Sequence, residues 1–142
     1  RGEVTAIVRT VRLAEALRAE SERLSRHAGI QIAMELEALP GVARDAALCL
    51  FRVGQESLNN VIRHSGAHAA SIVLRRMDGG LLLAIHDDGV GFDPEAPGKR
   101  RSLGLASMRE RVRLLNGTLD IESSPGQGAS IVAWVPAEVE LR

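Results

Sequence analysis

The fold is decided by the stretch Ser71-Ile72-Val73-Leu74-Arg75-Arg76-Met77-Asp78-Gly79-Gly80-Leu81-Leu82-Leu83-Ala84-Ile85-His86. Two apolar runs flank Asp78-Gly79-Gly80, which is a strong turn signal. We therefore expect a β-hairpin from Ala70 to Asp87. Because the connections between the expected strands are mostly of this hairpin kind, the sheet is expected to be mixed and largely antiparallel.

Two helices and one strand are expected before the hairpin. Residues 5–27 are dominated by Ala, Leu, Glu and Arg and carry an apolar stripe, which is typical of a helix. Residues 30–36 alternate apolar with polar side chains, as in a half-buried strand. Residues 44–64 repeat apolar side chains at helical spacing, and Gly66 follows them.

A loop, a helix and two strands are expected after the hairpin. Residues 88–104 are rich in Gly and Pro, a composition that suits a mobile loop. A helix is expected from about Leu105 to Leu115, with Asn116-Gly117 ending it in the left-handed conformation. The last two strands are expected at residues 118–123 and 129–136.

The length of 142 residues suits a single domain, residues 1–142. Five strands and three helices predict an α+β fold, a two-layer α/β sandwich whose mixed, mostly antiparallel sheet carries about three helices on one face. Residues 1–28 are expected to form its N-terminal helix. Because the chain starts at Arg1 and not at Met, we interpret it as an excised fragment or a processed product.

Composition argues against several classes of function. Aromatic residues make up 2% and the formal net charge is zero, which argues against binding of single-stranded or duplex nucleic acid. The single cysteine, Cys49, excludes an internal disulfide and a Cys-rich metal site. No stretch approaches the ~18 apolar residues that span a bilayer, and no signal peptide opens the chain. We expect a soluble, cytoplasmic fragment without membrane contact, whose full-length parent can still be membrane-anchored.

The helix at residues 44–64 carries the first candidate site. Glu56 and Asn60 are four residues apart and project from one helix face, with Arg63 as a neighbour of Asn60. A carboxylate, an amide oxygen and a cation gathered in this way can hold Mg²⁺ and a phosphate, because Mg²⁺ takes a few protein oxygens together with phosphate and water oxygens. The alternative is an ordinary solvated helix face.

The second candidate site follows the hairpin directly. Asp87, at the end of an apolar strand, can accept a hydrogen bond from an exocyclic amine such as that of adenine. Gly89 and Gly91 would let a flat ring approach the backbone closely. The alternatives are a turn stabilised by Asp and, less well matched in spacing, a calcium loop.

The third candidate site is Ser102-Leu103-Gly104-Leu105-Ala106-Ser107-Met108-Arg109-Glu110-Arg111. Gly104 is expected to open a helix, so that free backbone N–H groups and the positive end of the helix dipole face the preceding loop and suit a phosphate. The alternative is a plain helix start beside a solvated basic run.

Together these motifs resemble the ATPase domain shared by histidine kinases, gyrase-type topoisomerases, MutL mismatch-repair proteins and heat-shock chaperones. The nitrate-sensor and thermosensor class of sensor histidine kinases is the most similar. The motifs that carry the resemblance are the N box at residues 56–65, the first glycine box at 87–91, the second at 104–111 and the third at 125–128.

The resemblance implies a Bergerat-type ATP-binding fold with ATP and Mg²⁺ as cofactors. Asn60 would bind Mg²⁺, Glu56 would orient a water or polarise the reacting region, and Arg63 would contact phosphate or ribose. Asp87 would accept the adenine amine above a floor made by Gly89 and Gly91. Residues 93–103 would form the ATP lid. The backbone amides of Gly104 and Leu105 would hold phosphates.

Two residues and one missing feature depart from the family pattern. Ser107 replaces a common glycine, and Ala129 replaces the threonine of the third box. If that threonine hydroxyl supports the adenine carboxylate or a bridging water, its absence removes about 0.5–1.5 kcal/mol and weakens binding by up to roughly tenfold. None of the four histidines (His27, His64, His68 and His86) has the setting of a phosphoacceptor. We therefore expect that this fragment cannot phosphorylate itself. We also expect it to be a monomer.

The implied function is γ-phosphoryl transfer from Mg·ATP to a histidine of a separate dimerisation domain, in a two-component signalling kinase. A response regulator would be reached through that domain. Three alternatives stay open: an anti-sigma-factor-type serine kinase, a nucleotide-binding or interaction module without catalysis, and a structural domain without a ligand.

Overall fold

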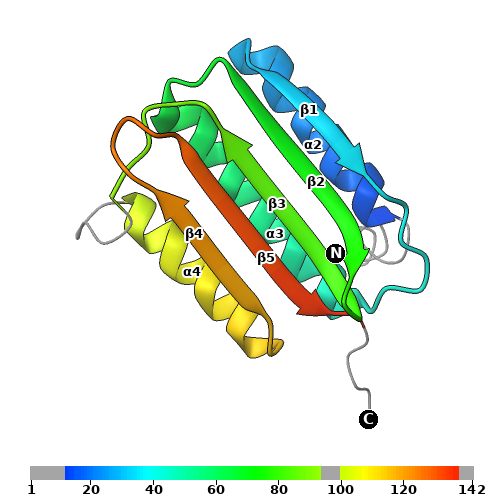
Figure 1. Ribbon diagram of the computed structural model, residues 1–142. Coiled ribbons are helices and arrows are strands. Elements are labelled where there is room, and N and C mark those ends of the chain that lie inside the picture. Colours follow the sequence, from blue (N-terminus) through cyan, green and yellow to red (C-terminus); the bar gives the residue numbers. More distant parts are fainter. Residues whose placement is uncertain (1–11, 94–99, 138–142) are drawn as a thin grey trace.

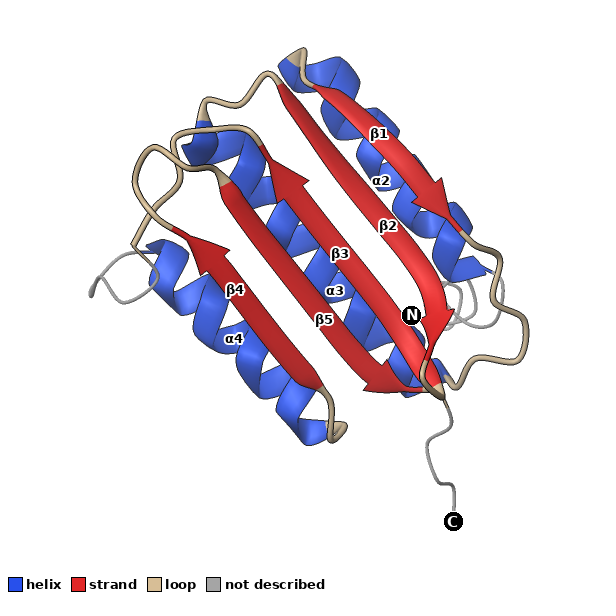
Figure 2. Ribbon diagram, viewed as in Figure 1, coloured by secondary structure: helices blue, strands red, loops and turns tan. Residues whose placement is uncertain are grey.

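The computed structural model describes residues 12–93 and 100–137. Within these residues, three α-helices lie on one face of a five-stranded sheet, and no described helix covers the other face (Figures 1 and 2). This arrangement confirms the predicted two-layer α+β sandwich. The elements are α2 Arg12–Ala28, β1 Gln31–Leu36, α3 Arg44–Asn60, the π-helix η1 Val61–Ser65, β2 Ala69–Met77, β3 Gly80–Asp87, α4 Arg100–Leu114, β4 Thr118–Ser123 and β5 Ala129–Pro136.

The sheet has the strand order β1-β2-β3-β5-β4. Only the β1–β2 pair is parallel among the described strands, so the sheet is mixed and mostly antiparallel as predicted. Asp78 and Gly79 turn the β2–β3 hairpin with φ angles of 52° and 73°. Positive φ at both central residues matches the right-handed twist of the strands, which is why Asp-Gly suits this turn.

An aliphatic core fills the space between the helices and the sheet. Leu13, Leu17 and Leu24 form the buried stripe of α2, which contacts β1 and α3. At the crossing with α3, a Cβ on Gly54 would lie 2.7 Å from a methyl of Leu17, so a glycine allows the two helices to approach closely. On the other side of α3, α4 buries Leu105, Met108 and Val112. No described helix is long and apolar enough to cross a membrane.

Most element boundaries agree with the sequence, and the last two strands agree to the residue. Residues 1–11, which include the start of the predicted N-terminal helix, lie outside the described residues, as does the part of the predicted lid at 94–99. The predicted start of the third helix near Leu105 is wrong: α4 begins at Arg100. Gly104 therefore lies inside a helix and does not open one.

The end of α4 has the predicted left-handed cap. Asn116 has φ 62°, and the N–H of Gly117 donates to the Val112 carbonyl at 2.9 Å. This bond satisfies a carbonyl that the helix end leaves open. The chain then enters β4 directly.

Candidate functional site

The C-terminal part of α3 presents Glu56 and Asn60, both half-buried. Their four-residue spacing places them on one face of the helix, as predicted. The side-chain nitrogen of Asn60 is buried and has no hydrogen-bond partner among the described residues. The unpaired atom is a donor, and leaving a buried donor without a partner costs about 1–3 kcal/mol, so the described residues leave this amide incompletely satisfied.

Beyond Asn60 the helix widens into the π-helix η1, which the sequence pattern did not indicate. Arg63 lies in this π-turn and is exposed. The prediction that Asn60 and Arg63 are neighbours on one face assumed α-helical spacing, and the π-turn has more residues per turn. Among the described residues, Arg63 forms no hydrogen bond or ion pair with Asn60 or Glu56.

Gly104 on α4 lies against the carboxylate of Glu56. A Cβ built on Gly104 would overlap Glu56 Oε2, so only glycine leaves Glu56 its present position. The structure thus brings the first and third candidate segments together through the contact of two helices. Leu105, beside Gly104, is buried, and its side chain belongs to the core.

A second link between these helices was not predicted. Ser57 is 1% exposed and its Oγ lies 3.5 Å from Met108 Sδ, which is itself buried on α4. The contact is next to Glu56 in sequence and lies where the two helices meet. The sequence signal that could have indicated this contact is a polar residue, Ser57, on the apolar face of a helix.

Asp87 ends β3 and is 4% exposed. Its Oδ1 accepts a hydrogen bond from the backbone N–H of Gly89 at 2.8 Å, and no described residue donates to its second oxygen. Burial raises the pKa of Asp87, while the Gly89 N–H and the nearby His86 oppose that rise. The site therefore contains a buried carboxylate with one oxygen fixed and one available.

Asp88 has a different role from its neighbour. It is exposed, and its Oδ1 accepts backbone N–H bonds from His68 at 3.0 Å and Ala69 at 3.2 Å. The N–H of Ala69 is the largest cause of the lowered pKa of Asp88, and desolvation partly opposes it. Asp88 therefore anchors the start of β2, a role that was not predicted from the sequence.

The Asp87 loop (residues 87–92) packs against the β4–β5 turn (residues 124–128). Gly91 has φ 71°, and a Cβ there would overlap the carbonyl oxygen of Ser124. Gly126 donates a backbone hydrogen bond to the Val90 carbonyl. The first and third glycine boxes thus touch through their backbones, which explains why glycine is needed at position 91.

The strand register places Ala129 directly opposite Asp87. The side chain of Ala129 is buried, whereas Ser130 faces the other side of the sheet, opposite the exposed His86. A hydroxyl at position 129 would lie beside the Asp87 carboxylate. Ser130 does not replace it, because successive side chains of a strand point to opposite faces of the sheet.

A groove of about 360 Å³ runs between α3 and α4 and contains Glu56. Neither Asn60 nor Asp87 is among its described lining residues, so this groove contains only part of the predicted site.

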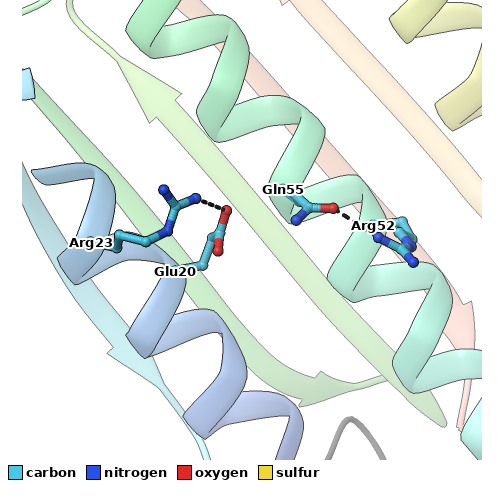
Figure 3. A network of polar contacts seen from close by, with 4 residues as sticks. All are labelled: Glu20, Arg23, Arg52 and Gln55. Carbon is cyan, nitrogen blue, oxygen red and sulfur yellow. Dashed lines mark hydrogen bonds and ion pairs between the residues drawn. The ribbon is translucent and has the colours of Figure 1, made fainter. Parts of the chain in front are cut away.

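Within the groove, Arg52 Nη1 donates a hydrogen bond to Gln55 Oε1 at 3.0 Å, which turns the Gln55 side chain toward the preceding turn of α3 (Figure 3). A similar pair, Arg23 and Glu20 at 2.8 Å, lies on α2.

Comparison with known proteins adds an independent finding. The family described as "Histidine kinase-, DNA gyrase B-, and HSP90-like ATPase" matches residues 46–139. An uncharacterized sensor-like histidine kinase of Chloroflexus aurantiacus is 44% identical over 94 residues, 63% of this chain and 16% of the relative. The sensor histidine kinase ComP of Bacillus subtilis is 44% identical over 85 residues, 59% of this chain and 11% of the relative. The chain matches less than a fifth of the length of these two relatives.

Solved structures share the fold. The histidine kinase domain of the blue-light activated histidine kinase EL346 from Erythrobacter litoralis has a TM-score of 0.75 at 20% identity, covering 88% of this chain and 61% of that chain. The Acinetobacter baumannii histidine kinase AdeS has a TM-score of 0.68 at 21% identity, covering 89% of this chain and 64% of that chain. At these identities the likeness establishes the fold alone.

Proposed function

The chain belongs to the family of histidine kinase-, DNA gyrase B- and HSP90-like ATPases, as the ATPase domain of a sensor histidine kinase, and on that premise we propose that it binds Mg·ATP for γ-phosphoryl transfer to a histidine. The acceptor histidine belongs to a dimerisation domain of the same kinase, through which a response regulator is phosphorylated. The observation that carries this proposal is the buried carboxylate of Asp87 with one oxygen available.

At the adenine end, Asp87 accepts the exocyclic amine through its available oxygen. The Gly89 N–H holds the other oxygen, so the carboxylate is oriented before the base arrives. Gly91 keeps the loop against the β4–β5 turn and, with Gly89, forms the floor under the base.

At the phosphate end, the side-chain oxygen of Asn60 is proposed as the protein ligand for Mg²⁺. Mg·ATP, when bound, supplies the phosphoryl group and the metal charge that neutralises the phosphates. Glu56 orients a water or polarises the reacting region, and Arg63 contacts phosphate or ribose. Gly104 acts by letting α4 lie against Glu56, and Leu105 by anchoring that turn of α4 in the core.

Calorimetric titration of ATP with Mg²⁺ tests the adenine end. Saturable binding is expected for the native chain, and Asp87→Asn is expected to weaken it by about a hundredfold. With its carbonyl oxygen on the Gly89 N–H, the amide of the variant turns its NH₂ toward the adenine amine, so that two donors face each other. Asp88→Asn is the matched control, because it makes the same chemical change at the next residue and is expected to bind as the native chain does. A folded native chain that binds no ATP would overturn the proposal.

Labelled ATP tests the acceptor. We expect no acid-labile phosphate on this chain alone, and phosphohistidine on a cognate dimerisation domain supplied in trans. Binding without transfer would instead support a nucleotide-binding module. We also propose that the domain works in the cytoplasm.

A further inference from the structure

One hydroxyl bridges the Asp87 loop and the β4–β5 turn. Ser123, the last residue of β4, is half-buried. Its Oγ accepts a hydrogen bond from the backbone N–H of Phe92 at 2.9 Å and donates one to the carbonyl of Gly128 at 2.7 Å. Both distances are those of well-formed hydrogen bonds. Ser123 therefore ties the end of the Asp87 loop to the start of β5.

The two backbone groups held by Ser123 lie next to the residues proposed to recognise adenine. A Cβ on Gly91 would lie 2.8 Å from the carbonyl oxygen of Gly128, and a Cβ on Gly128 would overlap the carbonyl oxygen of Asp87. Phe92 directly follows Gly91, and its side chain packs against the core. The position of Gly91 is thus fixed from its own side by Phe92 and from the opposite side by Gly128.

We propose that Ser123 is a positioning residue for adenine recognition, holding Gly91 and Asp87 in the geometry that accepts the base. This inference rests on the proposed function and adds a residue outside the glycine boxes and the N box. The hydroxyl touches no ligand and acts through the backbone. Its effect is therefore confined to the base and does not extend to the phosphates at the α3–α4 side.

The test compares ligands with and without adenine. For Ser123→Ala, we expect ATP and ADP to bind about tenfold more weakly, from the loss of two hydrogen bonds, and inorganic triphosphate with Mg²⁺ to bind unchanged. Ser123→Thr keeps the hydroxyl and is expected to restore nucleotide binding. Ser130→Ala, which removes a hydroxyl on the other face of the neighbouring strand, is expected to leave all three affinities unchanged.

Amide hydrogen exchange of the ligand-free chain gives a readout independent of ATP. The N–H of Phe92 is expected to exchange faster in Ser123→Ala, while amides in the middle of β3 keep their native rates. Native nucleotide affinity in Ser123→Ala, or an equal loss for triphosphate, would overturn the inference and leave the proposed function intact. Absence of ATP binding by the native chain would instead overturn both.

Discussion

The adenine end, formed by the Asp87 loop and the β4–β5 turn, and the phosphate end, formed by the facing parts of α3 and α4, are built in different ways. At the adenine end, polar groups are held before any ligand binds: Gly89 fixes one oxygen of Asp87, and Ser123 joins two stretches of backbone. At the phosphate end, the side-chain nitrogen of Asn60 is buried without a partner among the described residues, and Arg63 is exposed.

The difference follows from what each end is proposed to bind. A base is a rigid, neutral ring, so a pre-formed acceptor and a glycine floor recognise it at little cost in ordering. A triphosphate brings charge and a metal with its own ligands, and the side chains at that end are proposed to gain their partners when it binds. We therefore expect substitutions at the adenine end to act on stability and affinity, and those at the phosphate end to act on transfer.

The largest effect is expected from Gly91→Ala. The substitution places a side chain in the left-handed region and against the carbonyl of Ser124, and a backbone atom cannot move aside cheaply. We expect a loss of about 2–3 kcal/mol in the free energy of unfolding, measured by urea denaturation. Gly126→Ala is the control, because its φ is also positive, at 85°, but a Cβ there meets nothing within 4 Å. Equal losses in the two variants would contradict the backbone contact.

At the phosphate end, Gly104→Ala is expected to slow phosphoryl transfer and to change the stability little. The new methyl displaces the flexible carboxylate of Glu56, while alanine favours the helix by up to about 1 kcal/mol over glycine. The free energy of unfolding should stay within about 1 kcal/mol of the native value, and the rate of phosphoryl transfer to a dimerisation domain should fall about tenfold. A native transfer rate would show that the position of Glu56 has no role in the reaction.

Ala129→Thr is expected to strengthen ATP binding at the adenine end. The register places the new hydroxyl beside the Asp87 carboxylate, where a hydrogen bond of about 0.5–1.5 kcal/mol favours the charged form. ATP affinity should rise by up to about tenfold in calorimetry. Ser130→Thr adds a methyl group on the opposite face of the same strand and should leave the affinity unchanged. Weaker ATP binding in Ala129→Thr would mean that the buried position cannot accept the larger side chain.

The smallest expected effects are on the pH dependence of stability, and the contributions of the two neighbouring aspartates should have opposite signs. The pKa of Asp87 is raised above its ordinary value of 3.8 by burial. Relative to Asp87→Asn, the native chain should therefore lose stability as pH rises through that raised pKa. The pKa of Asp88 is lowered, chiefly by the Ala69 N–H, so relative to Asp88→Asn the native chain should lose stability as pH falls through the lowered pKa. Denaturation curves across the acidic range test this, and parallel pH profiles would contradict it.

Local sequence signals predicted the elements of this fold well. The Asp78-Gly79 turn, the alternating strands and the left-handed Asn116 depend on residues close together in the chain. The family resemblance inferred from the four boxes is confirmed by the match at residues 46–139. The roles of Glu56, Asn60, Arg63 and Asp87 toward ATP stay predictions.

Other features depended on residues far apart in the sequence. The start of α4 was misplaced because glycine is a poor helix former, yet Gly104 is tolerated where α4 meets Glu56. The π-turn after Asn60 left no mark in the apolar spacing of residues 44–64. Ser57 contacts Met108 across 51 residues, a pairing that no local pattern contains.

The sequence by itself determined the strands, the order of the elements and the family, because turn chemistry, side-chain alternation and the glycine boxes are local properties of the chain. Only the tertiary structure decided that Asp88 anchors the start of β2, which glycine faces Glu56 and which hydroxyl bridges the Asp87 loop to β5. Those outcomes depend on the strand register and on how closely two helices approach. Both are set by the packing of the whole core, and short stretches of sequence do not encode either of them.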